Sequence, residues 1–351
     1  MWNRSDGMTA EEIRLRRLAA QNLLFPDKKD GVTRNVCGFQ AQFFPNVRQA
    51  LGLRTGVLPN GDLGDGFAKS WTLRGTIHVF SRQDLPLFLG LEEHYRENRW
   101  DTPTWWNQRP DWTLTPARQQ YFSSVILEAL EEGPKNREEL KALCRTAGMT
   151  EAEEGSLFHP WGGGLRELCQ RGFLHYLPRE EKVFALTPEI SPMERDAAWL
   201  ELARRYFTYY GPATIHDAQY FFRVTATQVK GWLSKLPVQH CQLEGRTYYF
   251  IESAAWEHAS MPECLLLAGF DPLMLGYEKK ESLFLAPEHM RKVFNLGGIV
   301  FPTILLRGMV VGKWNRRGEA ELFEDLPARD RTRIAEAVQK NTEEAFAPSA
   351  R

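Results

Sequence analysis

Two stretches of this 351-residue chain carry the same turn and helix-start signals at the same spacing. Gly133-Pro134 and Gly211-Pro212 lie 78 residues apart, and the capping residues that follow them, Asn136 and Thr214, have the same offset. Glycine and proline interrupt a helix, whereas Asn and Thr begin one by accepting hydrogen bonds from its first backbone N–H groups. A shared offset for turn and cap indicates an internal duplication.

Apolar spacing and capping signals place helices and then a β element in each repeat, and the same order precedes the first repeat. The expected helices are 9–25, 33–43 and 46–53, then Gln120–Leu130, 136 onward and Gly162–Arg171, and finally Ala197–Tyr209, 214 onward and Thr225–Leu236. The expected strands are Trp71–Phe80, Phe173–Leu177 with Lys182–Leu186, and Val238–Leu243 with Arg246–Ile251. Helix, helix, helix and β is the order of a winged helix. We therefore predict an α+β chain with three tandem winged-helix domains.

The pattern changes from Cys264 onward, where short apolar runs are broken by Gly and Pro. Thr303–Leu306 and Met309–Lys313 are expected to form a hairpin. We predict a small C-terminal β-barrel-like domain there, followed by a charged helix over 326–345 and a frayed tail. The predicted domains are winged helix one at 1–115, winged helix two at 116–192, winged helix three at 193–258, the β-rich domain at 259–325, and the helix and tail at 326–351.

Charge and cysteine usage restrict the class of protein. The formal net charge of −1 gives no overall attraction to nucleic acid, but residues 278–317 carry eight Lys and Arg against three Glu. This basic segment is expected either to contact DNA or to be a solvated surface. No apolar run approaches the ~18 residues of a membrane helix, and the start of the chain turns acidic at Glu11-Glu12, unlike a signal peptide. Five scattered cysteines without a C-x-x-C pair favour reduced thiols in a cytoplasmic protein and exclude a zinc finger.

The segment Gly38–Pro45 contains two uncharged amides, Gln40 and Gln42, in an apolar run that ends at a proline. An amide is a poor metal ligand and does not titrate near neutral pH, so the pair is neither a metal site nor an acid–base pair. Two amides can instead hold a small polar guest such as a water molecule, through carbonyl acceptors and N–H donors. On a regular helix the two side chains would point about 200° apart, so they converge more easily on a distorted backbone. Because a Gln-x-Gln spacing also arises by chance, its meaning depends on the rest of the sequence.

Four motifs occur in order along the chain: F-Q-A-Q at 39–42, W-x-x-R-G-T-x-H at 71–78, FDPLML at 270–275 and GGIVFPTILLRGMVVGKW at 297–314. Together they resemble the AlkZ/YcaQ-like family of winged-helix DNA glycosylases over roughly residues 10–317. The resemblance implies three tandem winged helices and a C-terminal β-barrel around a DNA-binding cleft. It also implies monofunctional excision of N7-alkylated purines, including cross-linked ones, without a metal or other cofactor. On this chain Gln40 and Gln42 would hold and orient the hydrolytic water, and the Gln-x-Gln form is associated with protection against bulky natural-product alkylators.

The same motifs contain further candidate residues. Arg74 and His78 are expected to contact a phosphate or to line the lesion pocket. Alternatively, Arg74 pairs with a carboxylate and His78 packs in the core. Asp271 is a candidate for the same pocket, although an ion pair or a turn cap is the commoner role of such an aspartate. The DNA-contact candidates of the basic segment are Lys313, Trp314, Arg316 and Arg317. The tryptophan among them could stack on a base or pack in the core.

We therefore predict a monofunctional DNA glycosylase that acts as a monomer on double-stranded DNA carrying alkylated purines, in the cytoplasm and associated with the nucleoid when bound. An N7-alkylated purine is already cationic, so a positioned water and a dry site suffice for its removal. Base flipping and direct access to the lesion within the duplex both remain open. The alternative is a non-enzymatic winged-helix transcription regulator, which commonly pairs two winged helices across a dimer. A protein-docking scaffold is a third option.

Overall fold

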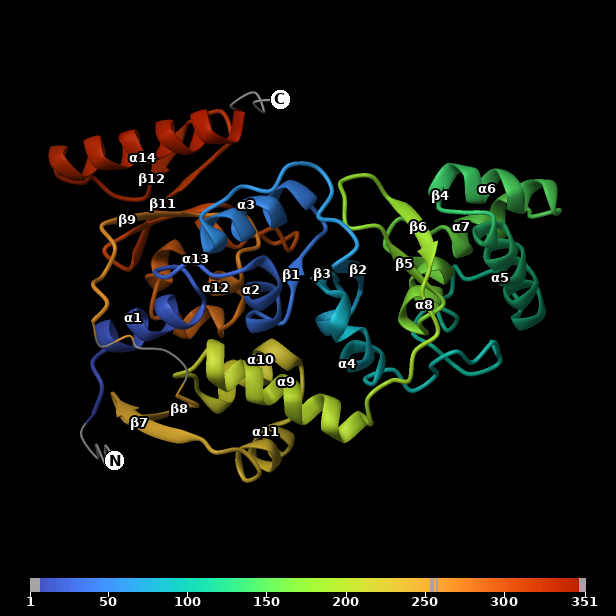
Figure 1. Cartoon of the computed structure of the whole chain (residues 1–351), viewed down its shortest axis with the longest axis horizontal. Coiled ribbons are helices and arrows are strands. Elements are labelled where there is room, and N and C mark those ends of the chain that lie inside the picture. Colours follow the sequence, from blue (N-terminus) through green and yellow to red (C-terminus); the bar gives the residue numbers. More distant parts are fainter. Residues whose placement is uncertain (1–6, 253–255, 257, 347–351) are drawn as a thin grey trace. The chain divides into compact units, whose positions relative to one another are not determined.

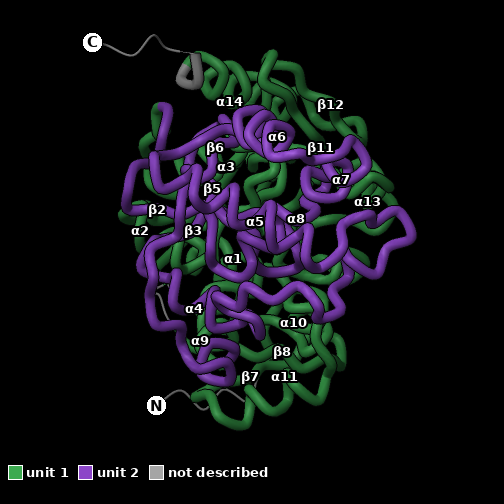
Figure 2. The backbone as a smooth tube through the Cα atoms, turned by 90° about the vertical axis from the view of Figure 1, so that its right-hand side faces the viewer, with its two compact units in different colours: residues 1–60, 200–351 green, residues 61–199 purple. Residues whose placement is uncertain are grey.

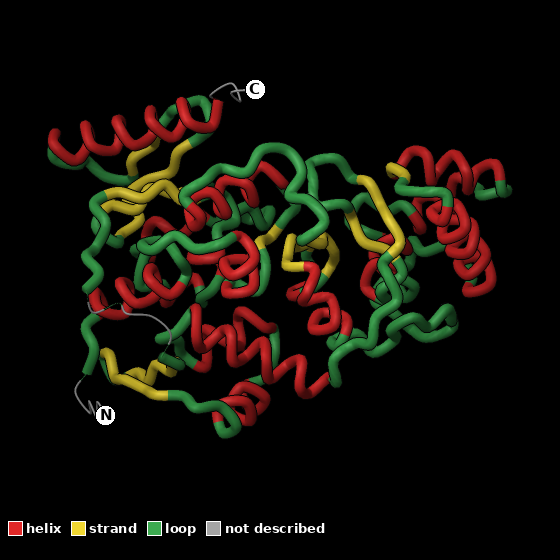
Figure 3. Tube along the Cα trace, in the orientation of Figure 1, coloured by secondary structure: helices red, strands yellow, loops and turns green. Residues whose placement is uncertain are grey.

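The helices and strands of the chain are drawn in Figure 1 and coloured by type in Figure 3. The computed structural model describes residues 7–252, 256 and 258–346. None of the helices in these residues is long and apolar enough to span a membrane. The chain divides into two compact units (Figure 2). Unit 1 contains the segments up to Asn60 and from Leu200 onward, and unit 2 contains Gly61–Trp199.

The boundaries of these units differ from the domain boundaries expected from the sequence. Residues 1–115 are predicted as one winged helix, yet the chain passes from unit 1 to unit 2 after Asn60. Residues 193–258 are likewise divided, because unit 2 ends at Trp199. The mixture of helices and strands confirms the α+β class. The arrangement as three tandem winged helices stays a prediction.

Three helices and a short strand form the N-terminal part of unit 1: α1 (Ala10–Ala20), α2 (Lys29–Asn35), β1 (Phe39–Gln40) and α3 (Phe44–Thr55). The predicted capping box of α1 is present, because the side chains of Thr9 and Glu12 each accept the backbone N–H of the other. The helix predicted over 33–43 is wrong, since α2 begins and ends earlier and extended backbone follows it.

The end of α2 explains this error. Cys37 has a φ of 56° and donates its N–H to the Arg34 oxygen, while Gly38 donates to the Thr33 oxygen at 2.9 Å. This pair of bonds is a Schellman motif, which ends a helix and turns the chain. The next helix, α3, begins with Pro45 in its first turn, where the missing proline N–H leaves no intrahelical bond unmade.

The middle part of unit 1 follows the predicted order. Its elements are α9 (Arg195–Tyr209, which begins in unit 2), α10 (Ile215–Phe222), α11 (Ala226–Leu233), β7 (Gln239–Leu243) and β8 (Arg246–Phe250). Thr214 and Thr225 cap α10 and α11, as expected, and β7 and β8 form the predicted hairpin.

The C-terminal part of unit 1 contains an open sheet and not the predicted barrel-like domain. Its elements are β9 (Cys264–Leu267), α12 (Pro272–Leu275), α13 (Met290–Val293), β10 (Thr303–Leu306), β11 (Met309–Trp314), β12 (Ala320–Leu322) and α14 (Ala328–Phe346). The strands are antiparallel neighbours in the order β12-β11-β10-β9, and the two edge strands do not pair with each other in the described part of the chain. The predicted hairpin is confirmed as β10–β11. Four short strands leave the sheet too narrow to close.

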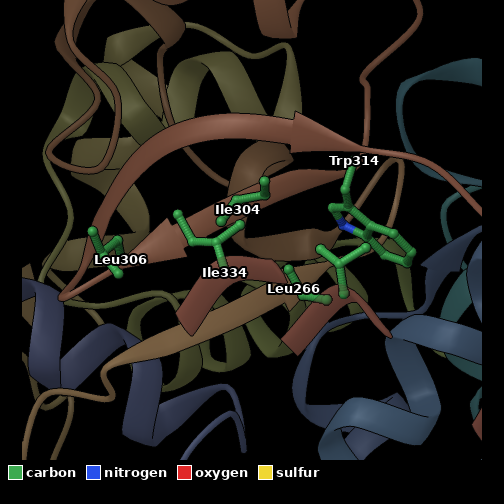
Figure 4. Close-up of a cluster of buried hydrophobic side chains, with 6 residues drawn as sticks. Leu266, Ile304, Leu306, Trp314 and Ile334 are labelled. Carbon is green, nitrogen blue, oxygen red and sulfur yellow. The ribbon is translucent and has the colours of Figure 1, made fainter. Parts of the chain in front are cut away.

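The helix α14 packs against this sheet. Apolar side chains from the strands and the helix form one buried cluster (Figure 4), made of Leu266, Ile304, Leu306, Trp314, Ile334 and Val338. Burying these side chains is what holds a charged helix on the sheet. The tail predicted after this helix lies outside the described residues.

Unit 2 contains a second sheet with helices around it. Its elements are β2 (Phe67–Trp71), β3 (Ile77–Ser81), α4 (Leu85–Leu89), α5 (Pro116–Glu131), β4 (Lys135–Asn136), α6 (Arg137–Thr146), α7 (Glu151–Leu157), α8 (Gly163–Gln170), β5 (Leu174–Tyr176) and β6 (Val183–Leu186). Within the unit, the strands are hydrogen-bonded in the order β3-β2-β5-β6-β4. The two wing strands predicted around residue 180 are confirmed as β5 and β6.

One prediction for unit 2 is corrected, and one helix was missed. The single strand expected over 71–80 is the end of β2, a turn, and most of β3, with Trp71 paired to Ile77. Arg74 and Gly75 have φ values of 59° and 64°, a left-handed conformation that reverses the chain. The helix α7 carries a Thr150 capping box and was not predicted.

The repeated turn-and-cap signals occupy equivalent places in the two units. Lys135, just before the cap of α6, pairs with Phe184 in β6. Ala213, just before the cap of α10, forms a bridge with Tyr249 in β8. In both stretches the residue before the cap therefore pairs with the second strand of the hairpin that follows.

Candidate active site

Gln40 ends the short strand β1, and Gln42 lies at a bend between this strand and α3. Phe39 and Ala41 are buried, whereas Gln40 is partly exposed and Gln42 is exposed. Both amides therefore reach the surface, while the residues between and before them pack in the core. The helical geometry that would point them apart does not occur here.

Aromatic and backbone contacts fix this segment within unit 1. The ring of Phe43 stacks on Phe270, with ring centroids 5.7 Å apart. Phe270 has a φ of 58°, and the residue before it, Gly269, approaches Asn46 of α3 so closely that a Cβ would lie 2.8 Å from its Nδ2. The residues that directly follow the F-Q-A-Q motif therefore contact the FDPLML motif, which is far away in the sequence.

Asp271 supports the same segment through Arg54. The guanidinium Nη1 and Nη2 donate to the two carboxylate oxygens at 2.9 and 2.7 Å, and both side chains are fully buried. The carboxylate also accepts the Leu273 N–H and so caps α12. The guanidinium carbon lies 5.7 Å from the centre of the Phe39 ring, next to Gln40. The structure thus places Asp271 in an ion pair and a cap, not in an accessible lesion pocket.

Two of the basic-segment candidates are already engaged. Trp314 is buried between the sheet and α14, and its indole N–H donates to the Leu267 oxygen at 3.0 Å. Trp314 therefore packs in the core, and the alternative expectation that it stacks on a base is wrong. Lys313 forms an ion pair with Glu321 at 3.0 Å at the surface of the sheet.

The other two candidates lie on the turn between β11 and β12. Arg316 and Arg317 are exposed there, and Nη2 of Arg316 donates to the Asn46 side-chain oxygen at 3.0 Å. Asn46 is in the first turn of α3, directly after the segment of the Gln pair. The structure therefore brings this basic turn next to the F-Q-A-Q motif.

In unit 2 the turn between β2 and β3 presents Arg74, which is partly exposed, and His78 is buried beside it. Nη2 of Arg74 lies 3.3 Å from Nε2 of His78. Because a guanidinium only donates, Nε2 accepts, and the ring proton is on Nδ1, which faces the Thr72 hydroxyl and the Thr76 oxygen. Burial and, second, the Arg74 charge lower the pKa of His78 to about 3. His78 is therefore a neutral core residue that orients Arg74.

Arg74 also lines a cavity of about 180 Å³ within unit 2. Burial and the charge of Arg82 lower the pKa of His175, in the same wall, to about 4, so this ring is uncharged at neutral pH. The rest of the wall combines aliphatic side chains with aromatic and polar ones, among them Trp71, Phe80, Phe88, Glu92, Gln170 and Trp199. Only the W-x-x-R-G-T-x-H motif signals this cavity in the sequence, because the other residues come from separate elements.

One cluster of potential metal ligands carries no sequence signal. Among the described residues, Glu288, His289 and Glu324 have ligand atoms within 4.8 Å of one another. Nε2 of His289 lies 2.8 Å from the Glu324 carboxylate, a hydrogen bond that accounts for the proximity of these two side chains without a metal.

Comparison with known proteins identifies the family. A model of the family described as DNA glycosylase AlkZ-like matches residues 33–343 of the chain. The chain belongs to this family. It is therefore a DNA glycosylase, and the resemblance inferred from the four motifs is confirmed.

Two relatives extend over nearly the whole chain. An interstrand DNA cross-link repair glycosylase of Streptomyces sahachiroi is 28% identical over 342 residues, which are 90% of this chain and 89% of that protein. The solved structure of the Streptomyces sahachiroi DNA glycosylase AlkZ matches with a TM-score of 0.72 at 23% identity, covering 96% of this chain and 97% of that one. The chain therefore has the fold of that AlkZ structure across both units.

Proposed function

We propose that this AlkZ-like chain excises N7-alkylated purines from double-stranded DNA, with a water that Gln40 and Gln42 hold against the sugar. The observation that carries the proposal is the surface position of both amides on the segment between α2 and α3, in a chain of a DNA glycosylase family. Amides can orient a water through lone pairs and N–H groups at once, but they cannot take its proton at neutral pH.

The proposed substrate removes the need for a strong base. In an N7-alkylated purine the imidazole ring already carries a positive charge. When the bond between the sugar C1′ and N9 breaks, its electron pair neutralises that charge, and the base leaves as a neutral molecule. The water oxygen then bonds to C1′, and its proton passes to solvent. Such a step depends on position and electrostatics more than on proton abstraction.

The carboxylate tied to this segment does not offer an alternative mechanism. Asp271 is fully buried and receives hydrogen bonds from Arg54 and from the Leu273 N–H. It can neither reach a water outside the core nor face a developing sugar cation. Its contribution under this proposal is to hold Arg54 against Phe39, and so to support the backbone from which Gln40 extends.

The relative from Streptomyces sahachiroi suggests the class of lesion. That protein is named an interstrand DNA cross-link repair glycosylase, and its similarity covers 90% of this chain. We therefore extend the proposal to bulky and cross-linked N7 adducts. The exposed Arg316 and Arg317, held beside α3 by the bond to Asn46, would contact the phosphates that flank the lesion.

The direct test is release of the base. Duplex DNA carrying one N7-methylguanine, and a second duplex with a bulkier N7 adduct, are incubated with the full chain, and abasic sites are detected as alkali-labile breaks. We expect base release from both duplexes, with and without a chelator, and no release from undamaged guanine. Binding of these duplexes without base release would instead support a non-enzymatic DNA-binding role.

A further inference from the structure

Two tryptophans of unit 2 lie largely in solvent. The side chain of Trp105 is 65% exposed and that of Trp161 is 76% exposed. Tryptophan usually buries most of its surface, and exposed large aromatic groups in a soluble protein commonly mark a contact site. Neither residue belongs to a motif of the sequence analysis, and neither lines the cavity beside Arg74.

The two exposed rings share one support. Trp105 contacts the buried ring of Trp106, with centroids 4.7 Å apart. Trp106 in turn contacts the ring of His159, with centroids 5.1 Å apart, and Nδ1 of His159 accepts the Trp161 N–H at 3.1 Å. The loop before α5 and the loop before α8 are thus joined below their exposed tryptophans.

The backbone around Trp161 is tightly constrained. Gly162 and Gly163, which begin α8, have φ values of 131° and 55°. At Gly163 a Cβ would collide with the Ser156 oxygen, so only glycine fits. The backbone turn next to Trp161 is therefore held in one conformation.

Arginines accompany these rings. Arg109 lies 5.2 Å from the Trp105 ring centre and 5.3 Å from that of Trp106, and it pairs with Asp111. Arg166 of α8 lies 4.7 Å from the Trp71 ring centre and 6.0 Å from that of Trp106. Arg109 thus lies beside the exposed Trp105, and Arg166 lies on the rings beneath. Arginines close to aromatic rings are common on surfaces that bind unpaired nucleic-acid bases.

We propose that Trp105 and Trp161 form a platform that stacks on a nucleobase of the DNA substrate that has lost its pairing partner. This inference rests on the proposed function, because it takes DNA as the partner. An exposed indole ring cannot reach the face of a base inside an intact stack, whereas an unpaired base offers that face. Stacking does not depend on base identity, so the platform suits an enzyme that meets lesions in many sequences.

The test measures binding of the full chain to undamaged DNA, because binding needs no excision. One duplex contains a single unpaired 2-aminopurine, and a second duplex of the same length is fully paired. We expect the chain to prefer the first duplex and to quench its 2-aminopurine fluorescence. Trp105→Ala and Trp161→Ala should each weaken binding to the unpaired-base duplex by about tenfold and restore the fluorescence.

Matched variants separate stacking from other effects. Trp105→Phe and Trp161→Phe should retain most of the affinity, because they keep an aromatic face. Tyr121→Ala removes an aromatic side chain of the same unit that is 47% exposed, and it should bind as the unaltered chain does. The dependence of binding on salt should be the same in all variants, since every arginine and lysine that could neutralise a phosphate is retained.

Three results would overturn the platform. One is unchanged affinity and quenching in the Ala variants. Another is an equal loss of affinity for both duplexes. The last is a change in the mass of the DNA-free chain in the Ala variants without an effect on DNA binding. That result would show that the two tryptophans contact a second copy of the chain. Because the DNA is undamaged, a chain that shows tryptophan-dependent quenching but releases no N7-methylguanine would refute the proposed function alone.

Discussion

At the residue scale, burial makes two ionisable side chains of the motifs, His78 and Asp271, unsuitable for acid–base chemistry. His78 is buried and uncharged, and Asp271 is neutralised by Arg54. Gln40 and Gln42 have no group that titrates near neutral pH. The proposed reaction therefore relies on a charge that the substrate brings with it.

The buried histidines of unit 2 predict how stability depends on pH. Burial holds the pKa of His78 near 3 and that of His175 near 4, below the ordinary value of 6.5. Between about pH 4 and 6.5 the unfolded chain binds protons that the folded chain does not, so acidification destabilises the fold by up to about 1.4 kcal/mol per pH unit for each ring. Urea unfolding of the chain and of His78→Asn across this range should show a smaller slope in the variant. Equal slopes would contradict the assignment of a buried neutral His78.

The Arg54–Asp271 pair predicts a large and non-additive effect on stability. Asp271→Asn or Arg54→Met alone should lower the free energy of unfolding by about 3–5 kcal/mol, because each leaves a buried charge without its partner. The double variant Arg54→Met/Asp271→Asn should be destabilised by less than the sum of the two single effects. Urea unfolding measures all three. Single variants that are destabilised by under about 1 kcal/mol would show that the pair is not buried in solution.

The sequence predicts the Gln pair but not how it is displayed. Two amides in an apolar run can be found by inspection, whereas their outward position depends on the turn at Cys37, where a residue other than glycine takes a φ of 56°. The roles of Asp271 and Trp314 were open in the sequence for a similar reason. Arg54 lies 217 residues from Asp271, and α14 packs over Trp314 only in the folded chain.

At the element scale, capping signals are the most reliable predictors. The boxes at Thr9, Asn136, Thr214 and Thr225 all begin helices, because a cap is a local interaction within four residues. The prediction of a single strand over 71–80 was wrong because the apolar alternation continues on both sides of the Arg74-Gly75 turn. A local apolar pattern therefore predicts that a strand is present more easily than it predicts a chain reversal inside the same pattern.

The turn between β11 and β12 predicts a specific salt dependence. Arg316→Ala/Arg317→Ala should weaken binding to duplex DNA and reduce the slope of log affinity against log salt by about 0.9 for each phosphate that the variant no longer neutralises. Arg331→Ala is the matched control, because it removes a half-exposed arginine that already pairs with Asp325. Fluorescence anisotropy at several salt concentrations measures the slopes. An unchanged slope in the double variant would place the DNA-binding surface elsewhere.

At the scale of the whole molecule, both ends of the described chain contribute to unit 1, whereas unit 2 is one continuous segment. Contacts such as Phe43–Phe270 and Arg54–Asp271 join the N-terminal segment to the part after Leu200. No periodic signal in a single sequence reports such pairings, which is why 1–115 was predicted as one domain.

The division into units predicts which fragment folds. Residues 61–199 should unfold cooperatively on their own, because their core lies within one continuous segment. Residues 1–115 should not, since the fragment lacks Asp271, the partner of Arg54, and Phe270, the partner of Phe43. Circular dichroism during thermal unfolding distinguishes the two. A cooperative transition for 1–115 would favour the predicted first winged helix over the observed unit.

The most direct measurement for the whole account is the single-turnover rate of base release from N7-methylguanine duplex by Gln40→Ala/Gln42→Ala. Removing both amides should lower the rate by about a hundredfold or more, as expected when groups that position a reactant are removed. Binding to the same duplex should stay within about twofold, because the variant removes no charge. A double variant that released the base at the rate of the unaltered chain would contradict the central claim that these two amides position the water.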